Sequence, residues 1–138
     1  MACMPPTFAL DRDNTRRFSR IKAVYISNSV KTDDILVFDA LLKRDNFIEK
    51  IEMFGYITEG NGKWPIYIQY KGNKGFIYWG SDPKDIKSKE ITTDINIFDK
   101  EIYVGQYITY SAINANNQRE EYTYQITDIR NWNDHCQN

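Results

Sequence analysis

Hydrophobic and polar residues alternate along several short stretches of the chain, as they do in strands that bury one face. The stretch IKAVYIS, at 21–27, is also rich in β-branched and aromatic residues, so we predict a strand there. Later in the chain, two long runs of this kind at 102–113 and 121–129 flank the polar stretch NANNQRE and predict a hairpin. Gly105, inside the first run, indicates a bulge or a sharp bend. Further strands are predicted at 56–60, 65–70 and 76–80.

The segment ILVFDALLKR, at 35–44, carries apolar residues at helical spacing. A helix would place Ile35, Phe38 and Leu42 on one face, so we predict a helix here. Because ILVF could also begin a buried strand, the periodicity leaves that alternative open.

The segment DNFIEKIEMFG, at 45–55, predicts a second helix. Asp45 would cap its first turn, and Gly55 stands where helices usually end. A helix of this length is stable only when tertiary packing supports it, so we expect it to lie against the sheet.

Together these elements predict a single α+β domain over 1–138. We expect an antiparallel, curved sheet of about five to seven strands with one or two short helices packed on one face. Loose ends are expected at about 1–6 and 131–138, because chain termini are often poorly ordered.

The stretch KWPIYIQYKGNKGFIYWG, at 63–80, predicts a tight hairpin, because Gly72 and Asn73 suit a two-residue turn. That turn sets Ile68 opposite Ile77, whereas a three-residue loop would swap the two faces of the hairpin. One face then carries Ile66, Ile68, Tyr70, Ile77 and Trp79 and is expected to be core. The other face is too aromatic for an ordinary solvent-exposed surface, so we expect another part of the chain, a second subunit or a partner to cover it. It carries Tyr67, Gln69, Phe76 and Tyr78.

The composition is that of an ordinary globular protein, with 41% hydrophobic and 27% charged residues. The net charge of −1 gives no overall field that would attract nucleic acid, so we do not expect a nucleic-acid partner. The ten tyrosines suit a protein whose work is contact, since tyrosine buries area at low entropy cost, although β-propensity is the simpler cause.

Few residues suit catalysis. The one histidine, His135, and the cysteines Cys3 and Cys136 lie near the chain ends without metal-binding spacing, and no phosphate-binding loop or nucleophile elbow occurs. A metal-dependent enzyme would need several carboxylates to converge, which no spacing requires. We therefore expect a non-catalytic protein with no metal or cofactor. The lack of a long apolar run and of a signal peptide predicts a cytoplasmic protein with no membrane contact.

The densest basic cluster comprises Arg12, Arg16, Arg17 and Arg20. If this segment were helical, Arg12, Arg16 and Arg20 would share a face and could bind a phosphate, a nucleotide or an acidic protein surface. A solvated arm, neutralised by two nearby aspartates, is the simpler interpretation.

We expect a binding or inhibitory protein, and a bacterial immunity-type protein that neutralises a toxin by direct contact is the sharpest version of this hypothesis. Acidic side chains would meet a basic toxin and speed association. Two alternatives stay open: a phage or bacterial protein that sequesters a nucleotide signal, and a small metal-dependent carboxylate enzyme such as a nuclease. A homo-oligomer also stays open. The predicted partner-binding residues are Tyr67, Gln69, Phe76, Tyr78, Asp33, Asp34, Asp39, Glu120 and Glu121.

Overall fold

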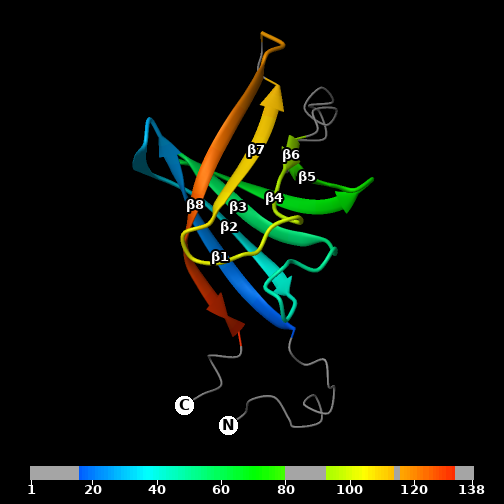
Figure 1. Cartoon of the computed structure of the whole chain (residues 1–138). Helices are drawn as coiled ribbons and strands as arrows, with labels where there is room; N and C mark the ends of the chain where they lie inside the picture. The colour runs from blue at the N-terminus through cyan, green and yellow to red at the C-terminus, as the bar shows by residue number, and fades with distance from the viewer. Residues whose placement is uncertain (1–15, 80–92, 114–115, 133–138) are drawn as a thin grey trace.

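A computed structural model describes residues 16–79, 93–113 and 116–132. Each strand in these residues pairs antiparallel with its neighbours in the chain, and β8 pairs with β1 to close a barrel (Figure 1). This is the up-and-down arrangement, in which closure removes the exposed sheet edges. The strands are β1 (Arg17–Ser27), β2 (Val30–Leu42), β3 (Met53–Glu59), β4 (Gly62–Lys71), β5 (Lys74–Trp79), β6 (Thr93–Ile95), β7 (Tyr107–Ile113) and β8 (Arg119–Asn131).

The predicted antiparallel pairing is confirmed, but the predicted α+β fold is wrong. No helix is among the elements of the described residues, and the sheet closes on itself instead of staying open. Most of 35–44 belongs to β2, where Leu36 and Phe38 are fully buried inside the barrel. Ile35 and Val37 lie on the opposite, outer face. Because both faces carry apolar residues, the run has no clear period of two and matches a helical spacing by coincidence.

The second predicted helix, at 45–55, is also wrong. The side chain of Asp45 accepts a hydrogen bond from the backbone N–H of Phe47 at 3.1 Å, which closes a turn instead of capping a helix. The loop that follows buries Ile48 against the core, and the N–H of Ile102 donates to the carbonyl of Asn46 at 2.8 Å. The loop therefore helps to close one end of the barrel, which a helix on the sheet face would not do.

Gly55, expected at the end of that helix, lies within β3 opposite Phe38 of β2. A Cβ atom at this position would stand 2.7 Å from the Cα of Phe38 and would also overlap with the carbonyl oxygen of Val37. The glycine therefore marks a close approach of two strands.

The predicted register of the hairpin at 63–80 is confirmed. Strands β4 and β5 pair Tyr67 with Tyr78 and Ile68 with Ile77. Gly72 and Asn73 have φ angles of 59° and 69°, the left-handed conformation that a two-residue turn of this kind requires. The predicted core face points into the barrel, so the aromatic second face is part of the outer wall.

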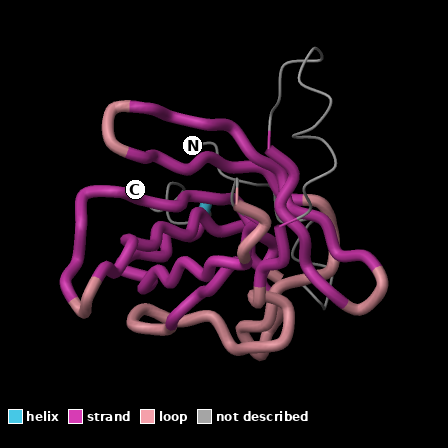
Figure 2. Tube along the Cα trace, turned by 90° about the horizontal axis from the view of Figure 1, so that it is seen from above, coloured by secondary structure: helices cyan, strands magenta, loops and turns pink. Residues whose placement is uncertain are grey.

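Buried side chains fill the barrel interior, which the strands surround in Figure 2, and their type changes from one end of the barrel to the other. Isoleucine, leucine and phenylalanine occupy the end near the loops that precede β3 and β7. Four tyrosines and one tryptophan gather toward the end near the β1–β2 and β7–β8 hairpins, whereas Tyr70 packs against Phe98 at the other end. Gly105 makes the sharp bend expected of it, with φ of 102°, so β7 begins later than the apolar run around it.

Substituting Gly55 with alanine is expected to lower the free energy of unfolding by about 3 kcal/mol, because the new methyl group meets backbone atoms that cannot move away. Chemical denaturation would measure this loss. Gly62→Ala is the matched control in the same β3–β4 hairpin, since its Cβ would come close only to the half-exposed ring of Trp64, at 3.0 Å, and would make an ordinary contact with the carbonyl oxygen of Glu59 at 3.4 Å. The control should lose less than about 1 kcal/mol. Equal losses in the two variants would contradict the strand contact.

Candidate functional site

The outer wall of β3, β4 and β5 carries a row of aromatic rings. Tyr67 stacks on Tyr78 with ring centroids 5.0 Å apart, and Phe54 lies 5.9 Å from Tyr67 on its other side. The side chain of Phe54 is 64% exposed. We call Phe54, Tyr67 and Tyr78 the aromatic row. Each ring holds its neighbour in place, so the row is a preformed apolar surface that faces solvent.

Two more predicted partner-binding residues lie beside the aromatic row. Gln69 and Phe76 are opposite each other in β4 and β5. The same cross-strand line continues from Phe76 to Asp94, then to Ser111, and ends at Glu121 of β8. The structure therefore brings a predicted acidic residue, Glu121, onto the continuous outer surface that begins at the aromatic row.

The structure places other predicted acidic residues near one end of the barrel. Asp34 accepts a hydrogen bond from the N–H of Gly60 at 2.9 Å, and Glu120 accepts one from the hydroxyl of Tyr122 at 3.1 Å. Asp33 is exposed next to Asp34. These three carboxylates are near hairpin tips and are not part of the aromatic wall.

Two members of the predicted arginine cluster, Arg16 and Arg20, pair with different carboxylates. Arg16 forms an ion pair with Glu49 at 3.0 Å, whereas Arg20 donates to Asp39, another predicted partner-binding residue, at 2.9 Å. The hydrogen bond with Asp39 raises the pKa of Arg20, and the charge of Asp39 adds to the shift. Arg20 belongs to a strand, β1, and not to the helix that would have aligned it with Arg12 and Arg16. Arg17, in the same strand, lies on the opposite side of the sheet from Arg20. Arg12, Cys3, His135 and Cys136 lie outside the described residues.

Inside the barrel lies a cluster of rings that the sequence analysis missed. Tyr110 is in contact with Tyr122, Tyr124 and Trp79, at centroid distances of 5.1, 5.8 and 5.9 Å, and Tyr25 is 5.4 Å from Tyr124. We call these five residues the tyrosine cluster. They come from β1, β5, β7 and β8, so only the closed barrel brings them together. The alternation of tyrosines in β8 was the available signal, because it places two of them on one face.

Burial keeps the deepest phenols of this cluster neutral. Burial raises the pKa of Tyr124 to about 12, and the charges of Asp34 and Glu59 add to the shift. The pKa of Tyr110 is also raised, first by burial and then by its neighbour Tyr124. Both hydroxyls are therefore protonated, and act as uncharged hydrogen-bonding groups, over the whole physiological pH range.

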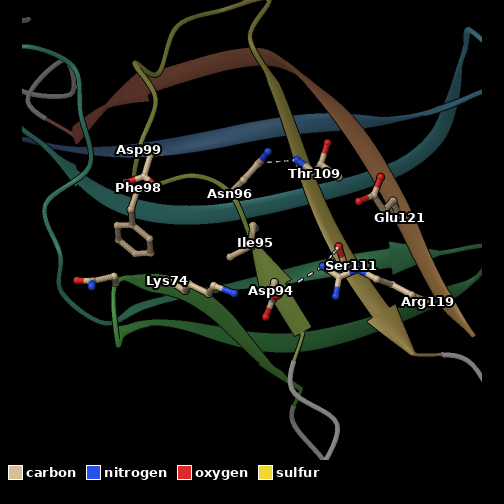
Figure 3. A pocket seen from close by; sticks show the side chains of 12 residues that line it. Lys74, Asp94, Ile95, Asn96, Phe98, Asp99, Thr109, Ser111, Arg119 and Glu121 are labelled. Carbon is tan, nitrogen blue, oxygen red and sulfur yellow. Dashed lines mark hydrogen bonds and ion pairs between the residues drawn. The ribbon is translucent and has the colours of Figure 1, made fainter. Parts of the chain in front are cut away.

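Two of the grooves on the outer wall matter for recognition. The first, of about 270 Å³, crosses β5 to β8 and is lined mainly by polar side chains (Figure 3). Within it, Arg119 lies 3.5 Å from Asp94 and donates to Ser111 at 3.0 Å, so two of the charged side chains of this polar groove pair with each other.

The second groove, of about 440 Å³, crosses β8, β1, β2 and β3. Sequence analysis anticipated one of its residues, Arg20, but not the set, because the residues are distant in sequence and meet only across β1. We call it the basic groove. Its lining residues are Arg20, Lys22, Ile35, Val37, Tyr56, Asp128, Arg130 and Trp132.

Within residues 16–79, 93–113 and 116–132, no group of three or more His, Cys, Asp or Glu side chains is placed to hold a metal ion. The same residues contain no helix that is long and apolar enough to cross a membrane. Comparisons of the chain with protein-family models, with curated proteins and with solved structures found no match. Function is therefore inferred from the surfaces described above.

Alkaline pH is expected to destabilise the protein through the tyrosine cluster. An ordinary tyrosine has a pKa of 10.0, whereas Tyr124 in the folded protein has one of about 12. Stabilisation by the raised pKa is fully present below pH 10 and is lost between pH 10 and 12, where only the unfolded chain gives up its protons. Each buried phenol should contribute about 1.4 kcal/mol per pH unit to the fall in unfolding free energy.

Urea denaturation between pH 9 and 12 would measure this fall. In Tyr124→Phe, the fall of the unfolding free energy with pH should be less steep by about 1 kcal/mol per pH unit. Tyr103→Phe, which changes an exposed ring, should match the wild-type protein. If Tyr124→Phe lost stability with pH as steeply as the wild-type protein, Tyr124 would not be a source of the alkaline destabilisation.

Proposed function

We propose that this protein is a non-catalytic binding protein that inhibits a partner protein by direct contact. The partner binds the outer wall of β3, β4 and β5. In its sharpest form the proposal is an immunity-type protein that neutralises a basic toxin. The single observation that carries the proposal is the exposed aromatic row on a closed, rigid barrel.

The aromatic row has the properties of an interface centre. Tyrosine and phenylalanine bury large areas with few rotatable bonds, and aromatic residues are enriched where partners meet. Tyr67 is held between Phe54 and Tyr78, so little of its side-chain freedom remains to be lost on binding. Water leaves a preformed apolar surface of this kind when a partner covers it, which favours association.

Polar residues around the aromatic row support a protein partner over a small ligand. Gln69 offers an amide for hydrogen bonding beside Phe76, and Glu121 lies farther along the same wall. At one end of the barrel, Asp34 and Glu120 add negative charge, although both accept hydrogen bonds within the chain. Carboxylates outside the apolar contact would speed the approach of a basic partner more than they would tighten the complex.

The barrel interior offers less support for ligand binding. Eight-stranded barrels hold a small ligand when space remains between the strands. Here Ile21, Leu36, Phe38, Ile68 and Ile77 are fully buried, and the tyrosine cluster is packed ring against ring. The described part of the interior is therefore occupied by side chains, and the outer wall is the surface available for recognition.

The double variant Tyr67→Ser/Tyr78→Ser is expected to lose partner binding. Removal of two central rings should weaken the complex at least about hundredfold, because interface energy is concentrated in a few aromatic residues. The wild-type protein, immobilised, would be used to capture the partner from its native host, and titration of the purified partner would give the affinities. Under the immunity hypothesis, the wild-type protein also abolishes the toxic activity of that partner.

Tyr107→Ser is the matched control, since Tyr107 is a half-exposed tyrosine on β7, away from the aromatic row. It should bind like the wild-type protein. Equal binding by the double variant and the control would exclude the aromatic row as the contact surface. Retention of no protein partner by the wild-type chain would refute the proposal as a whole.

A further inference from the structure

The basic groove is built on two adjacent cross-strand lines of the outer wall. In the first line, Arg130 of β8 lies opposite Arg20 of β1, which in turn lies opposite Asp39 of β2. Like charges directly opposite each other destabilise a sheet, so the Arg20–Arg130 pair carries a cost. The bidentate hydrogen bond of Arg20 with Asp39 offsets part of that cost.

The second line supplies the floor of the basic groove. Asp128 lies opposite Lys22, Lys22 opposite Val37, and Val37 opposite Tyr56. Val37 is on the outer face of β2 but is only 5% exposed, because the longer side chains around it form walls. The apolar floor and the charged walls on either side of it form a recessed site and not a flat strand surface.

A β-bulge turns Asp128 and Arg130 of β8 toward this groove. The pairing of β1 with β8 shifts register between Lys22 and Ala23, which adds one residue to β8 at Thr127. Without the shift, Asp128 and Arg130 would face the interior. Bulges that re-aim side chains are over-represented next to functional sites.

The charge of the basic groove is unbalanced. Three cationic side chains line it, namely Arg20, Lys22 and Arg130, against one carboxylate, Asp128, at 3.8 Å from Arg130. Asp39, beside the groove, is ion-paired with Arg20 at 2.9 Å, and the ammonium group of Lys63 lies 4.1 Å from the ring centre of Tyr56. With these two flanking groups included, four cationic side chains stand against two carboxylates. An anion bound here would lower the repulsion between Arg20 and Arg130.

Flat rings complete the basic groove. The guanidinium of Arg20 lies 5.4 Å from the ring centre of Trp132, and Tyr56 stands across the floor from it. Rings beside cationic side chains are the usual means by which proteins bind a nucleobase and its phosphate together. The volume of about 440 Å³ is in the range of small-ligand sites.

We infer that the basic groove binds a nucleoside phosphate, with the phosphate at Arg20, Lys22 and Arg130 and the base on the apolar floor between Tyr56 and Trp132. The ligand is either a free nucleotide or one unit of a single strand, since both present the same chemistry. This inference does not rest on the proposed protein partner, which binds the wall centred on β4 and β5.

Isothermal titration of the full chain at low salt would test the inference. The probes are AMP, ADP, a single-stranded RNA octamer, adenosine, inorganic phosphate and an acidic peptide of glutamate and tyrosine. AMP, ADP or the octamer should bind at least about tenfold more tightly than adenosine or phosphate, each of which engages half of the site. Binding of the mononucleotides identifies a free nucleotide as the ligand, and binding of the octamer alone identifies a strand.

Arg130→Gln is expected to weaken nucleotide binding about tenfold, through loss of a charge-assisted hydrogen bond. Arg119→Gln, on the polar groove, is the matched control and should bind like the wild-type protein. The two arginine side chains are 63% and 61% exposed, and each is ion-paired to an aspartate at 3.8 or 3.5 Å. Asp128→Asn removes the opposing charge and should tighten binding severalfold.

Three results would overturn the inference. The first is no binding of AMP, ADP or the octamer at about 1 mM, a concentration that detects even weak sites. The second is an equal loss of affinity in Arg130→Gln and Arg119→Gln. The third is binding of the acidic peptide as tightly as the nucleotides, which would assign the basic groove to a protein.

Discussion

The pairing of β1 with β8 is the constraint on which the rest of this structure depends. It joins the first and the last described strands, from Ser19–Asn131 to Ile26–Thr123. Without it, both strands would present unpaired N–H and C=O groups at open edges, and the core would lose one wall. Pairing β1 with β8 also costs a large loop-closure entropy, because the two strands are far apart in sequence.

Closure divides every strand into an inner and an outer set of side chains. The inner set forms the aliphatic core and the tyrosine cluster, in which Tyr110 and Tyr124 are buried. The outer set carries the aromatic row and the basic groove. Since neighbouring side chains in a strand point to opposite faces, each strand contributes to stability and to recognition at alternate positions. The bulge of β8 shifts the alternation of side chains by one residue, so that Arg130 faces outward.

The two proposed recognition surfaces are neighbours on the outer wall. They meet at β3, which carries Phe54 in the aromatic row and Tyr56 in the basic groove. A protein partner and a nucleoside phosphate would therefore contact side chains only two positions apart on one short strand.

The sequence by itself determined what depends on near neighbours. The turn at Gly72 and Asn73 set the register of β4 and β5, because backbone geometry at two residues decides how the flanking strands pair. It also predicted that Tyr67 and Tyr78 would face away from the core. Only the tertiary structure decided that most of 35–44 is a strand, since its apolar residues on both faces fit either period and pairing with β1 settles the choice. The barrel, the tyrosine cluster and the basic groove likewise depend on contacts between β1 and β8, whose long sequence separation leaves no local signal.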